Sequence, residues 1–121
     1  MKPNVAEALK QDRTIDITTL GRKTGQLRRI EIWFHNLDGR LFITGFPGSR
    51  HWYANLAAPP EFTFHLKESV EADLPALARP VLDNAQRREI IAAIHGKLDW
   101  GRDVEEWVAD SPLVEIELTG P

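Results

Sequence analysis

The feature that most constrains the fold of this chain is a set of three strand-like runs between residues 14 and 45, joined by two short glycine turns. In the first run, Ile15 and Ile17 alternate with polar residues, which is the period of two expected of a half-buried strand. The second and third runs flank Asp38-Gly39, a dipeptide typical of a two-residue hairpin. The pattern predicts antiparallel strands at residues 14–20, 28–37 and 41–45.

Two side-chain orientations follow from this pattern. In the run 28–37, Ile30, Ile32 and Phe34 are expected on one face, and Trp33 and His35 on the other, because successive strand residues point to opposite faces. We expect His35 to be half exposed, and His65 likewise in a later strand. None of the four histidines stands at metal-ligand spacing with another ligand, so no metal site is predicted.

The rest of the chain predicts more strands and a few helices. Alternation of apolar residues recurs at 61–66, 70–81 and 112–119, with Pro75 indicating an edge, a bulge or a kink. Asp83 and Gln86 have the spacing of a capping box, which begins a helix over 83–97. Shorter helices are expected after Pro3 and at residues 50–58 and 103–110. The prediction is a mainly β chain with α: one domain over residues 1–121, a barrel of about six antiparallel strands with two or three short helices.

Composition excludes several functional classes. The 121 residues include no cysteine, which excludes disulfides, thiol catalysis and cysteine-built zinc sites. A net charge of −3 argues against general nucleic-acid binding. No apolar run has the length of a membrane span or of a signal peptide, so a cytoplasmic protein without a transmembrane segment is expected.

The glycine turn that joins the first two strands is unusually basic. Gly21 and Gly25 permit a tight turn or a close approach to a ligand, and backbone amides in such a turn can hold an anion. Four positive charges lie within eight residues, and a threonine hydroxyl stands among them: Arg22, Lys23, Thr24, Arg28 and Arg29. Arginine and lysine bind phosphate well. The alternative is an ordinary hairpin with a solvated tip, and spacing alone does not decide between the two.

A second candidate segment follows the third strand. Its residues Phe46, Gly48, Ser49 and Arg50 form a loop with one positive charge, and Ser49 is placed to cap the helix 50–58. Helix N-termini attract anions and carbonyl oxygens. In the helix, Trp52 is a candidate ligand contact or a plug for one end of the barrel. Asn55 is a candidate contact or a local hydrogen-bonding residue.

Together these segments resemble a known family. Residues 18–25 (Thr-Thr-Leu-Gly-Arg-Lys-Thr-Gly), followed by Arg28-Arg29, resemble the signature of the deazaflavin-dependent nitroreductases. Residues 51–60 are similar to that family's block of histidine, tryptophan, Asn-Leu, alanine and proline. The resemblance implies a split β-barrel of the flavin-binding, pyridoxamine-phosphate-oxidase-like class. It also implies that Thr19, the residues of the basic turn and the loop and helix 46–58 line the cofactor.

The resemblance implies an oxidoreductase that transfers hydride from reduced deazaflavin coenzyme F420 to a small electron-poor acceptor, such as a quinone, a nitro compound or an enone. Three alternatives stand beside it: an FMN-binding reductase of the same fold, a non-catalytic flavin carrier, and a structural protein whose basic turn contacts a partner. Split barrels of this class also pair. A homodimer is therefore predicted, with a seam at the strand faces of Trp33 and His35, or of Phe62 and Phe64.

Overall fold

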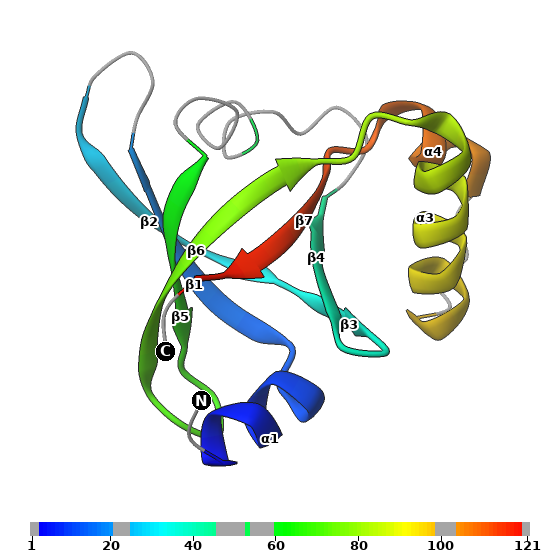
Figure 1. The fold of residues 1–121 in the computed structure, drawn as a ribbon. Helices are drawn as coiled ribbons and strands as arrows, with labels where there is room; N and C mark the ends of the chain where they lie inside the picture. The colour runs from blue at the N-terminus through cyan, green and yellow to red at the C-terminus, as the bar shows by residue number, and fades with distance from the viewer. Residues whose placement is uncertain (1–2, 21–24, 46–52, 54–59, 99–103, 120–121) are drawn as a thin grey trace.

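The computed structural model describes residues 3–20, 25–45, 53, 60–98 and 104–119. Its secondary structure is mostly antiparallel sheet with three helices in the described residues (Figure 1). In chain order the elements are α1 (Pro3–Gln11), β1 (Thr14–Leu20), β2 (Leu27–Trp33), β3 (His35–Leu37), β4 (Arg40–Thr44), β5 (Glu61–Leu66), β6 (Ala72–Pro80), α3 (Asn84–Leu98), α4 (Val104–Asp110) and β7 (Leu113–Leu118).

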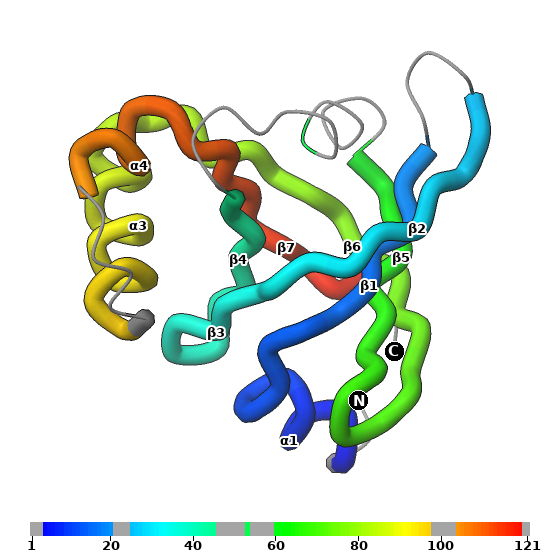
Figure 2. The backbone as a smooth tube through the Cα atoms, turned by 180° about the vertical axis from the view of Figure 1, so that it is seen from behind, coloured from blue at the N-terminus to red at the C-terminus, as the bar shows by residue number. Residues whose placement is uncertain are grey.

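The sheet closes on itself through one bent strand. Its strand order is β2-β1-β5-β6-β7-β4-β3, so β2 and β3 stand at opposite ends of the order. In the chain, however, only Phe34 separates them. The bent strand pairs with β1 through β2 and with β4 through β3, and the sheet between these contacts curls into a barrel (Figure 2). The single strand predicted over 28–37 is thus two strands, which gives seven in place of about six.

The bend at Phe34 also changes which side chains are buried. Phe34 donates its N–H to the carbonyl of Arg13 at 3.0 Å, and its side chain is 2% exposed. His35, the next residue, is 6% exposed, so the prediction of a half-exposed His35 is wrong. Strict alternation fails here because the strand leaves one partner for another. The turn at Asp38-Gly39 is as predicted, with positive φ at both residues, 53° and 94°.

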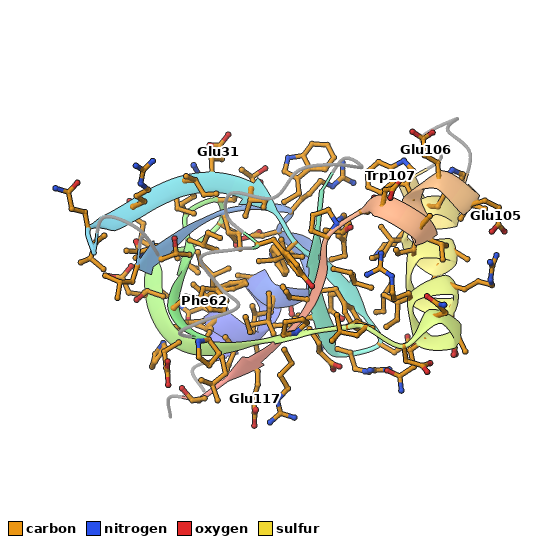
Figure 3. All side chains as sticks on the ribbon, turned by 90° about the horizontal axis from the view of Figure 1, so that it is seen from above. Glu31, Phe62, Glu105, Glu106, Trp107 and Glu117 are labelled. Atoms are coloured by element: carbon orange, nitrogen blue, oxygen red, sulfur yellow. The ribbon has the colours of Figure 1, made fainter. Side chains whose placement is uncertain are left out.

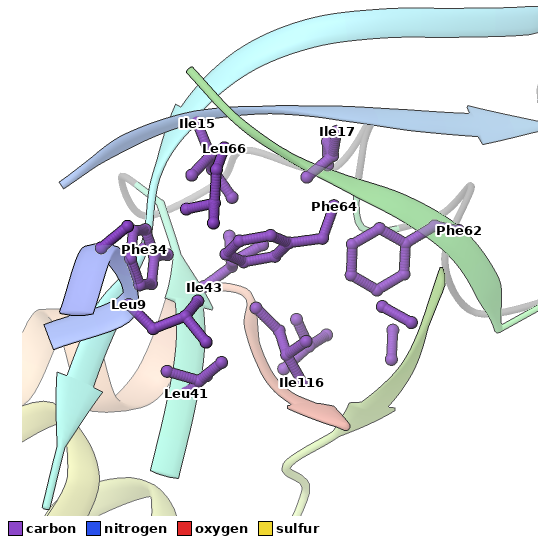
Figure 4. Packing of buried hydrophobic residues seen from close by; sticks show 14 of the residues in the cluster. Leu9, Ile15, Ile17, Phe34, Leu41, Ile43, Phe62, Phe64, Leu66 and Ile116 are labelled. Carbon is purple, nitrogen blue, oxygen red and sulfur yellow. The ribbon is translucent and has the colours of Figure 1, made fainter. Parts of the chain in front are cut away.

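The barrel interior holds a wholly apolar cluster, the barrel core. Its rings meet edge-on where Phe34 and Phe64 pack with centroids 5.2 Å apart and an interplanar angle of 79° (Figure 4). Phe62 and Phe64 both belong to this core, so neither is available for a dimer seam, and the prediction that placed one there is wrong. The same holds for His35, whereas Trp33 is 43% exposed.

A second cluster, the helix-side core, lies between β4 and the helices α3 and α4. It exists because β4 is buried on both faces: Leu41 and Ile43 point into the barrel, and Phe42 points to the helices. The Asp83 carboxylate caps α3 by accepting the Gln86 N–H at 3.0 Å, as the capping-box spacing predicts. The helix then contributes Ile90, Ile91 and Ile94 to the cluster, and α4 contributes Trp107 and Val108.

A buried arginine in α3 connects this helix to α4 and to the ends of β6 and β7 around the helix-side core. Arg87, 9% exposed, donates to the carbonyls of Val81, Val108 and Ser111 at 2.6–3.0 Å. These carbonyls lie just after β6, within α4 and just before β7. One guanidinium thus fixes both helices to the neighbouring strand ends, because its planar fork carries several donors in rigid geometry.

The smaller predictions also hold. α1 closes one end of the barrel with Val5, Ala8 and Leu9 buried. Pro75 lies in β6 just before the ladder with β7 begins at Ala76, and although it has no N–H to donate, its carbonyl accepts the Thr119 N–H at 3.0 Å. No helix among the described residues is long and apolar enough to cross a membrane.

Candidate cofactor-binding site

The two segments predicted to bind a cofactor begin and end at the same end of the barrel. β1 ends at Leu20 and β2 begins at Leu27, on either side of the basic turn; β4 ends at Thr44 and β5 begins at Glu61, on either side of the second segment. All four strand ends lie at the barrel end opposite α1 (Figure 1). Within the described part of the chain are Thr19, Gly25, Arg28 and Arg29. The other predicted site residues lie outside the described residues: Gly21, Arg22, Lys23, Thr24, Phe46, Gly48, Ser49, Arg50, Trp52 and Asn55.

Gly25 has the backbone conformation for which the turn selects glycine. Its φ is +70°, in the left-handed region that residues with a Cβ rarely adopt. No atom lies within 4 Å of the position that a Cβ would occupy, so packing does not require glycine there. The backbone conformation does, as the prediction of a tight turn at this residue implies.

The register between β1 and β2 separates the two arginines that follow the turn. Arg28 is opposite Thr19, and Ile30 and Ile32 are opposite Ile17 and Ile15, which are fully buried in the barrel core. Arg28 therefore lies on the inner face of the sheet, at the rim of the barrel, beside the 3% exposed Thr19. Arg29 lies on the outer face.

On the outer face, Arg29 is already engaged. Its Nε donates to Asp16 Oδ2 at 2.9 Å, and Lys67 Nζ lies 2.8 Å from Asp16 Oδ1 and also binds Glu31. The hydrogen bond from Lys67, with the neighbouring Arg29, holds the pKa of the Asp16 carboxyl below its usual value. Two cations and two carboxylates therefore balance on this face. Figure 3 shows Glu31 pointing away from the barrel.

Arg28, in contrast, has no compensating charge among the residues that the structure describes. Its side chain is exposed, and it forms no hydrogen bond or ion pair with any residue that the structure describes. Of the two adjacent arginines, this one has no donor engaged by a described residue, whereas Arg29 has its Nε bonded to Asp16. Alternation along the strand puts the two arginines on opposite faces, but local sequence cannot show that Arg29 pairs with Asp16, because that contact depends on the register between β1 and β2.

Next to Arg28 the inner face becomes apolar. Ile30 is 37% exposed, and Ile32 and Tyr53 are partly buried against the barrel core. A charged rim followed by half-exposed apolar side chains suits a ligand with an anionic tail and a flat ring. The residues present thus fit a phosphate-bearing flavin-like cofactor.

The outer face carries a polar chain that sequence reasoning missed. Thr18 Oγ1 lies 2.6 Å from His65 Nε2, and His65 Nδ1 lies 2.6 Å from Asp73 Oδ1. His65 is 7% exposed, so the prediction of a half-exposed side chain is wrong. The Asp73 carboxylate can only accept, so Nδ1 donates to it, and Nε2 lies within hydrogen-bond distance of the Thr18 hydroxyl. Among the described residues no group of three or more acidic or histidine side chains is arranged to hold a metal.

Solved structures confirm the fold. A protein named F420 reductase has 17% identity and a TM-score of 0.70, over 94% of this chain and 92% of that one. A conserved hypothetical protein from Mycobacterium tuberculosis has 17% identity and a TM-score of 0.74, over 99% and 82%. A pyridoxinephosphate-oxidase-family protein from Clostridium acetobutylicum, related to general stress protein 26, has 11% identity and a TM-score of 0.71, over 94% and 80%. The barrel is the split β-barrel that the sequence predicts.

The model of a protein family matches residues 2–97, most of the chain. Its description is F420H2-dependent quinone reductase. The matched region contains the basic turn, the bent strand and α3 almost to its end. Dependence on coenzyme F420, which the sequence motifs imply, is thereby confirmed. The chain belongs to the F420H2-dependent quinone reductase family and is an F420-dependent reductase.

Proposed function

We propose that this protein reduces a small electron-poor organic acceptor, of the quinone, nitro or enone class, at the end of the barrel where β1 meets β2. Reduced F420, when bound, supplies the hydride. The protein's own part is to bind and orient, since donor and acceptor in contact need positioning more than acid–base catalysis. A cytoplasmic location belongs to the same proposal.

The observation that carries the proposal is that Arg28, which pairs with none of the described residues, lies beside an apolar inner face. The phosphate and acidic tail of the cofactor would meet Arg28 together with Arg22, Lys23 and Thr24 of the turn, and the amides of Gly21 and Gly25. Arg29 would contribute less to this arrangement, because it lies on the outer face and its Nε donates to Asp16. The ring would lie toward Ile30 and Ile32, and the loop and helix predicted at 46–58 would complete its contacts.

The acceptor would then stack on the exposed side of the ring. The support for a flat acceptor is the apolar character of the inner face, where Ile30 remains 37% exposed and Tyr53 is partly buried. A polar, hydrated acceptor would lose hydrogen bonds there without replacement. Quinones and nitroaromatic compounds match such a surface better than sugars or amino acids do.

The first test is a titration of F420, followed by quenching of its fluorescence, into the wild-type protein, Arg28→Ala and Arg29→Ala at two salt concentrations. Hydrogen bonds to charged groups contribute about 1.5–3 kcal/mol, so Arg28→Ala should weaken binding about tenfold or more and reduce the salt dependence. Arg29→Ala is the matched control and should change affinity less than about threefold, since exposed ion pairs contribute little. Equal losses of F420 affinity in the two variants would contradict the assignment of Arg28, and not Arg29, to the cofactor.

The second test measures turnover. Oxidation of reduced F420 with a panel of quinone, nitro and enone acceptors should show activity with at least one class. Tight binding of F420 without turnover of any acceptor would favour a carrier. Tighter binding of FMN than of F420 would favour the FMN-binding alternative. The homodimer predicted from the sequence remains part of the proposal. Thr19, Arg28 and Ile30 lie together within one copy of the chain, so this part of the site does not require a second copy.

A further inference from the structure

Three polar side chains form a chain across three adjacent strands of the sheet. β5 lies between β1 and β6, and His65 of β5 is on the outer face, with Thr18 of β1 on one side and Asp73 of β6 directly opposite on the other. The Thr18 hydroxyl lies 2.6 Å from Nε2 of the ring, and Asp73 Oδ1 lies 2.6 Å from Nδ1. A hydroxyl, an imidazole and a carboxylate joined in this order form the arrangement by which hydrolytic enzymes activate a nucleophile.

The two outer members of the chain fix the role of the imidazole. Because the Asp73 carboxylate accepts from Nδ1, a neutral His65 ring carries its proton there and turns the lone pair of Nε2 toward Thr18. The His65 side chain is 8% exposed, so little water competes with the Thr18 hydroxyl for Nε2. The Asp73 side chain is 76% exposed and ends the chain at the surface. Nε2 is therefore placed to take the proton of the Thr18 hydroxyl as a general base.

A cation stands on the other side of the same hydroxyl. Arg29 of β2 is directly opposite Thr18. The Phe34 N–H bonds to Arg13, and the alternation of an antiparallel ladder makes Thr18 and Arg29 a pair without mutual backbone hydrogen bonds, in which the side chains lie close together. Nε of Arg29 donates to Asp16, and no residue that the structure describes bonds to its two terminal nitrogens. These nitrogens can donate to a negative oxygen that forms beside Thr18.

We propose that this chain of side chains, the outer-face triad, is a second site, which transfers acyl groups from small activated esters to the Thr18 hydroxyl and then to water. The Thr18 side chain is half-buried, and it lies on the side of the sheet opposite to Thr19 and the candidate cofactor site. The outer face of a sheet encloses little of a substrate, so the ester has to be small and its leaving group good. The acyl transfer needs no reductant and does not involve F420.

The acyl transfer has two halves. In the first, Thr18 Oγ1 bonds to the carbonyl carbon of the ester while Nε2 of His65 takes the hydroxyl proton, and Arg29 donates to the negative carbonyl oxygen. The C–O bond to the alcohol then breaks, and the alcohol oxygen takes the proton from Nε2. In the second half, a water molecule repeats these steps on the ester of Thr18. The products are an alcohol and a carboxylic acid, and Thr18 regains its hydroxyl.

The test uses p-nitrophenyl acetate and the wild-type protein without F420. Release of p-nitrophenol should begin with a burst and continue more slowly, because the acetyl ester of threonine is less activated than the p-nitrophenyl ester and reacts with water more slowly. Mass spectrometry of peptides from acid-quenched protein should place the acetyl group on Thr18. Thr18→Val removes the hydroxyl but keeps the branched shape, so it should abolish the burst and lower the rate of release about tenfold or more. Thr18→Ser should retain both.

Asp73 is the positioning residue of the outer-face triad, and its variants distinguish acyl transfer from a purely structural link between strands. Asp73→Asn should lower the rate of p-nitrophenol release, because an amide can hold the ring in the wrong tautomer, whereas Asp73→Glu should keep part of the rate. Thr63→Val is the matched control, since Thr63 of β5 is directly opposite Thr18 on the same face but lies outside the triad. Its rate and burst should equal those of the wild type. Thermal melting of each variant confirms that it is folded.

Several results would overturn the proposal. They are p-nitrophenol release no faster than in buffer, a Thr18→Val variant as active as the wild type, and acetyl groups on lysines such as Lys67 but not on Thr18. An Asp73→Asn variant with the wild-type rate and burst would also contradict the triad. Arg29→Ala separates the two sites, because it should lower the rate of p-nitrophenol release and leave F420 affinity nearly unchanged. None of these outcomes bears on Arg28, whose role the F420 titration measures separately.

Discussion

The barrel core and the helix-side core differ in what surrounds them. The barrel core is entirely apolar, with Phe64, Ile15 and Ile17 fully buried. The helix-side core shares β4 with it but is bordered by buried basic groups, Arg87 among strand and helix carbonyls and His35 opposite Phe42. One cluster depends on apolar area and shape alone. The other depends in addition on hydrogen bonds and on the protonation state of a histidine, so the two should respond differently to mutation and to pH.

The largest effect is expected in the barrel core. Phe64→Ala removes a fully buried ring that packs on Phe34, and it should lower the free energy of unfolding by about 3–5 kcal/mol, through lost apolar burial and a cavity. Urea unfolding measures the loss, and it should be the same at pH 5 and pH 7. A loss under about 1 kcal/mol would mean that the barrel interior collapses around the cavity.

The next effect is a pH dependence of the helix-side core. Burial, assisted by the charges of Lys97 and Arg13, lowers the pKa of His35 to about 4 from a usual value of 6.5. The unfolded chain therefore takes up a proton between these values and the folded protein does not, so stability is complete above pH 6.5 and falls as the pH drops toward 4. The loss should reach at most about 3 kcal/mol, at 1.36 kcal/mol per pKa unit.

His35→Gln is the control for this prediction. It should remove most of the change in unfolding free energy between pH 7 and pH 5. The carboxyl groups whose pKa values are lowered in the fold, such as Asp16, Glu68 and Glu115, lose their stabilising charge only as the pH falls through their lowered pKa values, below that range. An unchanged slope in His35→Gln would show that another group titrates.

Arg87→Lys should have a smaller effect. Lysine keeps the positive charge but not the planar fork, so it cannot serve the carbonyls of Val81, Val108 and Ser111 together. Carbonyls left without a donor should cost about 2 kcal/mol in unfolding free energy. Amide hydrogen exchange distinguishes this variant from Phe64→Ala. Arg87→Lys should lower the protection of the α4 amides more than that of the barrel amides, whereas Phe64→Ala should leave the ratio between the two unchanged. An equal loss of amide protection in α4 and in the barrel would contradict a role of Arg87 that is confined to the two helices and the adjoining strand ends.

The smallest effect is expected at Ser111. Its hydroxyl is buried and has no hydrogen-bond partner among the described residues, whereas its backbone N–H and C=O are bonded to Trp107 and Arg87. On folding, this hydroxyl loses its hydrogen bonds to water and forms none in their place. Ser111→Ala removes that cost, so the unfolding free energy should stay the same or rise by up to about 1 kcal/mol. A loss above about 1 kcal/mol in thermal or urea unfolding would show that the hydroxyl is satisfied in solution.

The regular parts of this fold could be predicted from the sequence, because they rest on local patterns. The strands at 14–20 and 61–66 agree with the structure, since β-branched and aromatic residues alternate there without interruption. The break at Phe34 could not be predicted, because it depends on where the strand exchanges β1 for β4. Arg87 was missed for a similar reason: its acceptors in α4 and before β7 lie 21 and 24 residues away.

The candidate site shows the same limit. The basic turn was found because glycines and cations stand close together in the chain, and Gly25 has the predicted positive φ. The different contacts of Arg28 and Arg29 were not found, because the ion pair of Arg29 with Asp16 follows from the pairing of β2 with β1. A register between β1 and β2, had it been assigned from Ile15 and Ile17, would have set Arg29 close to Asp16 of the neighbouring strand.

The position of β7 has a consequence for how the chain folds as it is made. β7 lies between β6 and β4, so both ladders that complete this side of the barrel need residues 113–118. The hairpins β1–β2 and β3–β4 pair neighbours in the chain and can form early, whereas closure brings together segments about 70 residues apart, which is slow. Until the ribosome has released residue 118, the facing edges of β4 and β6 stay open, and the nascent protein is exposed to mispairing during that interval.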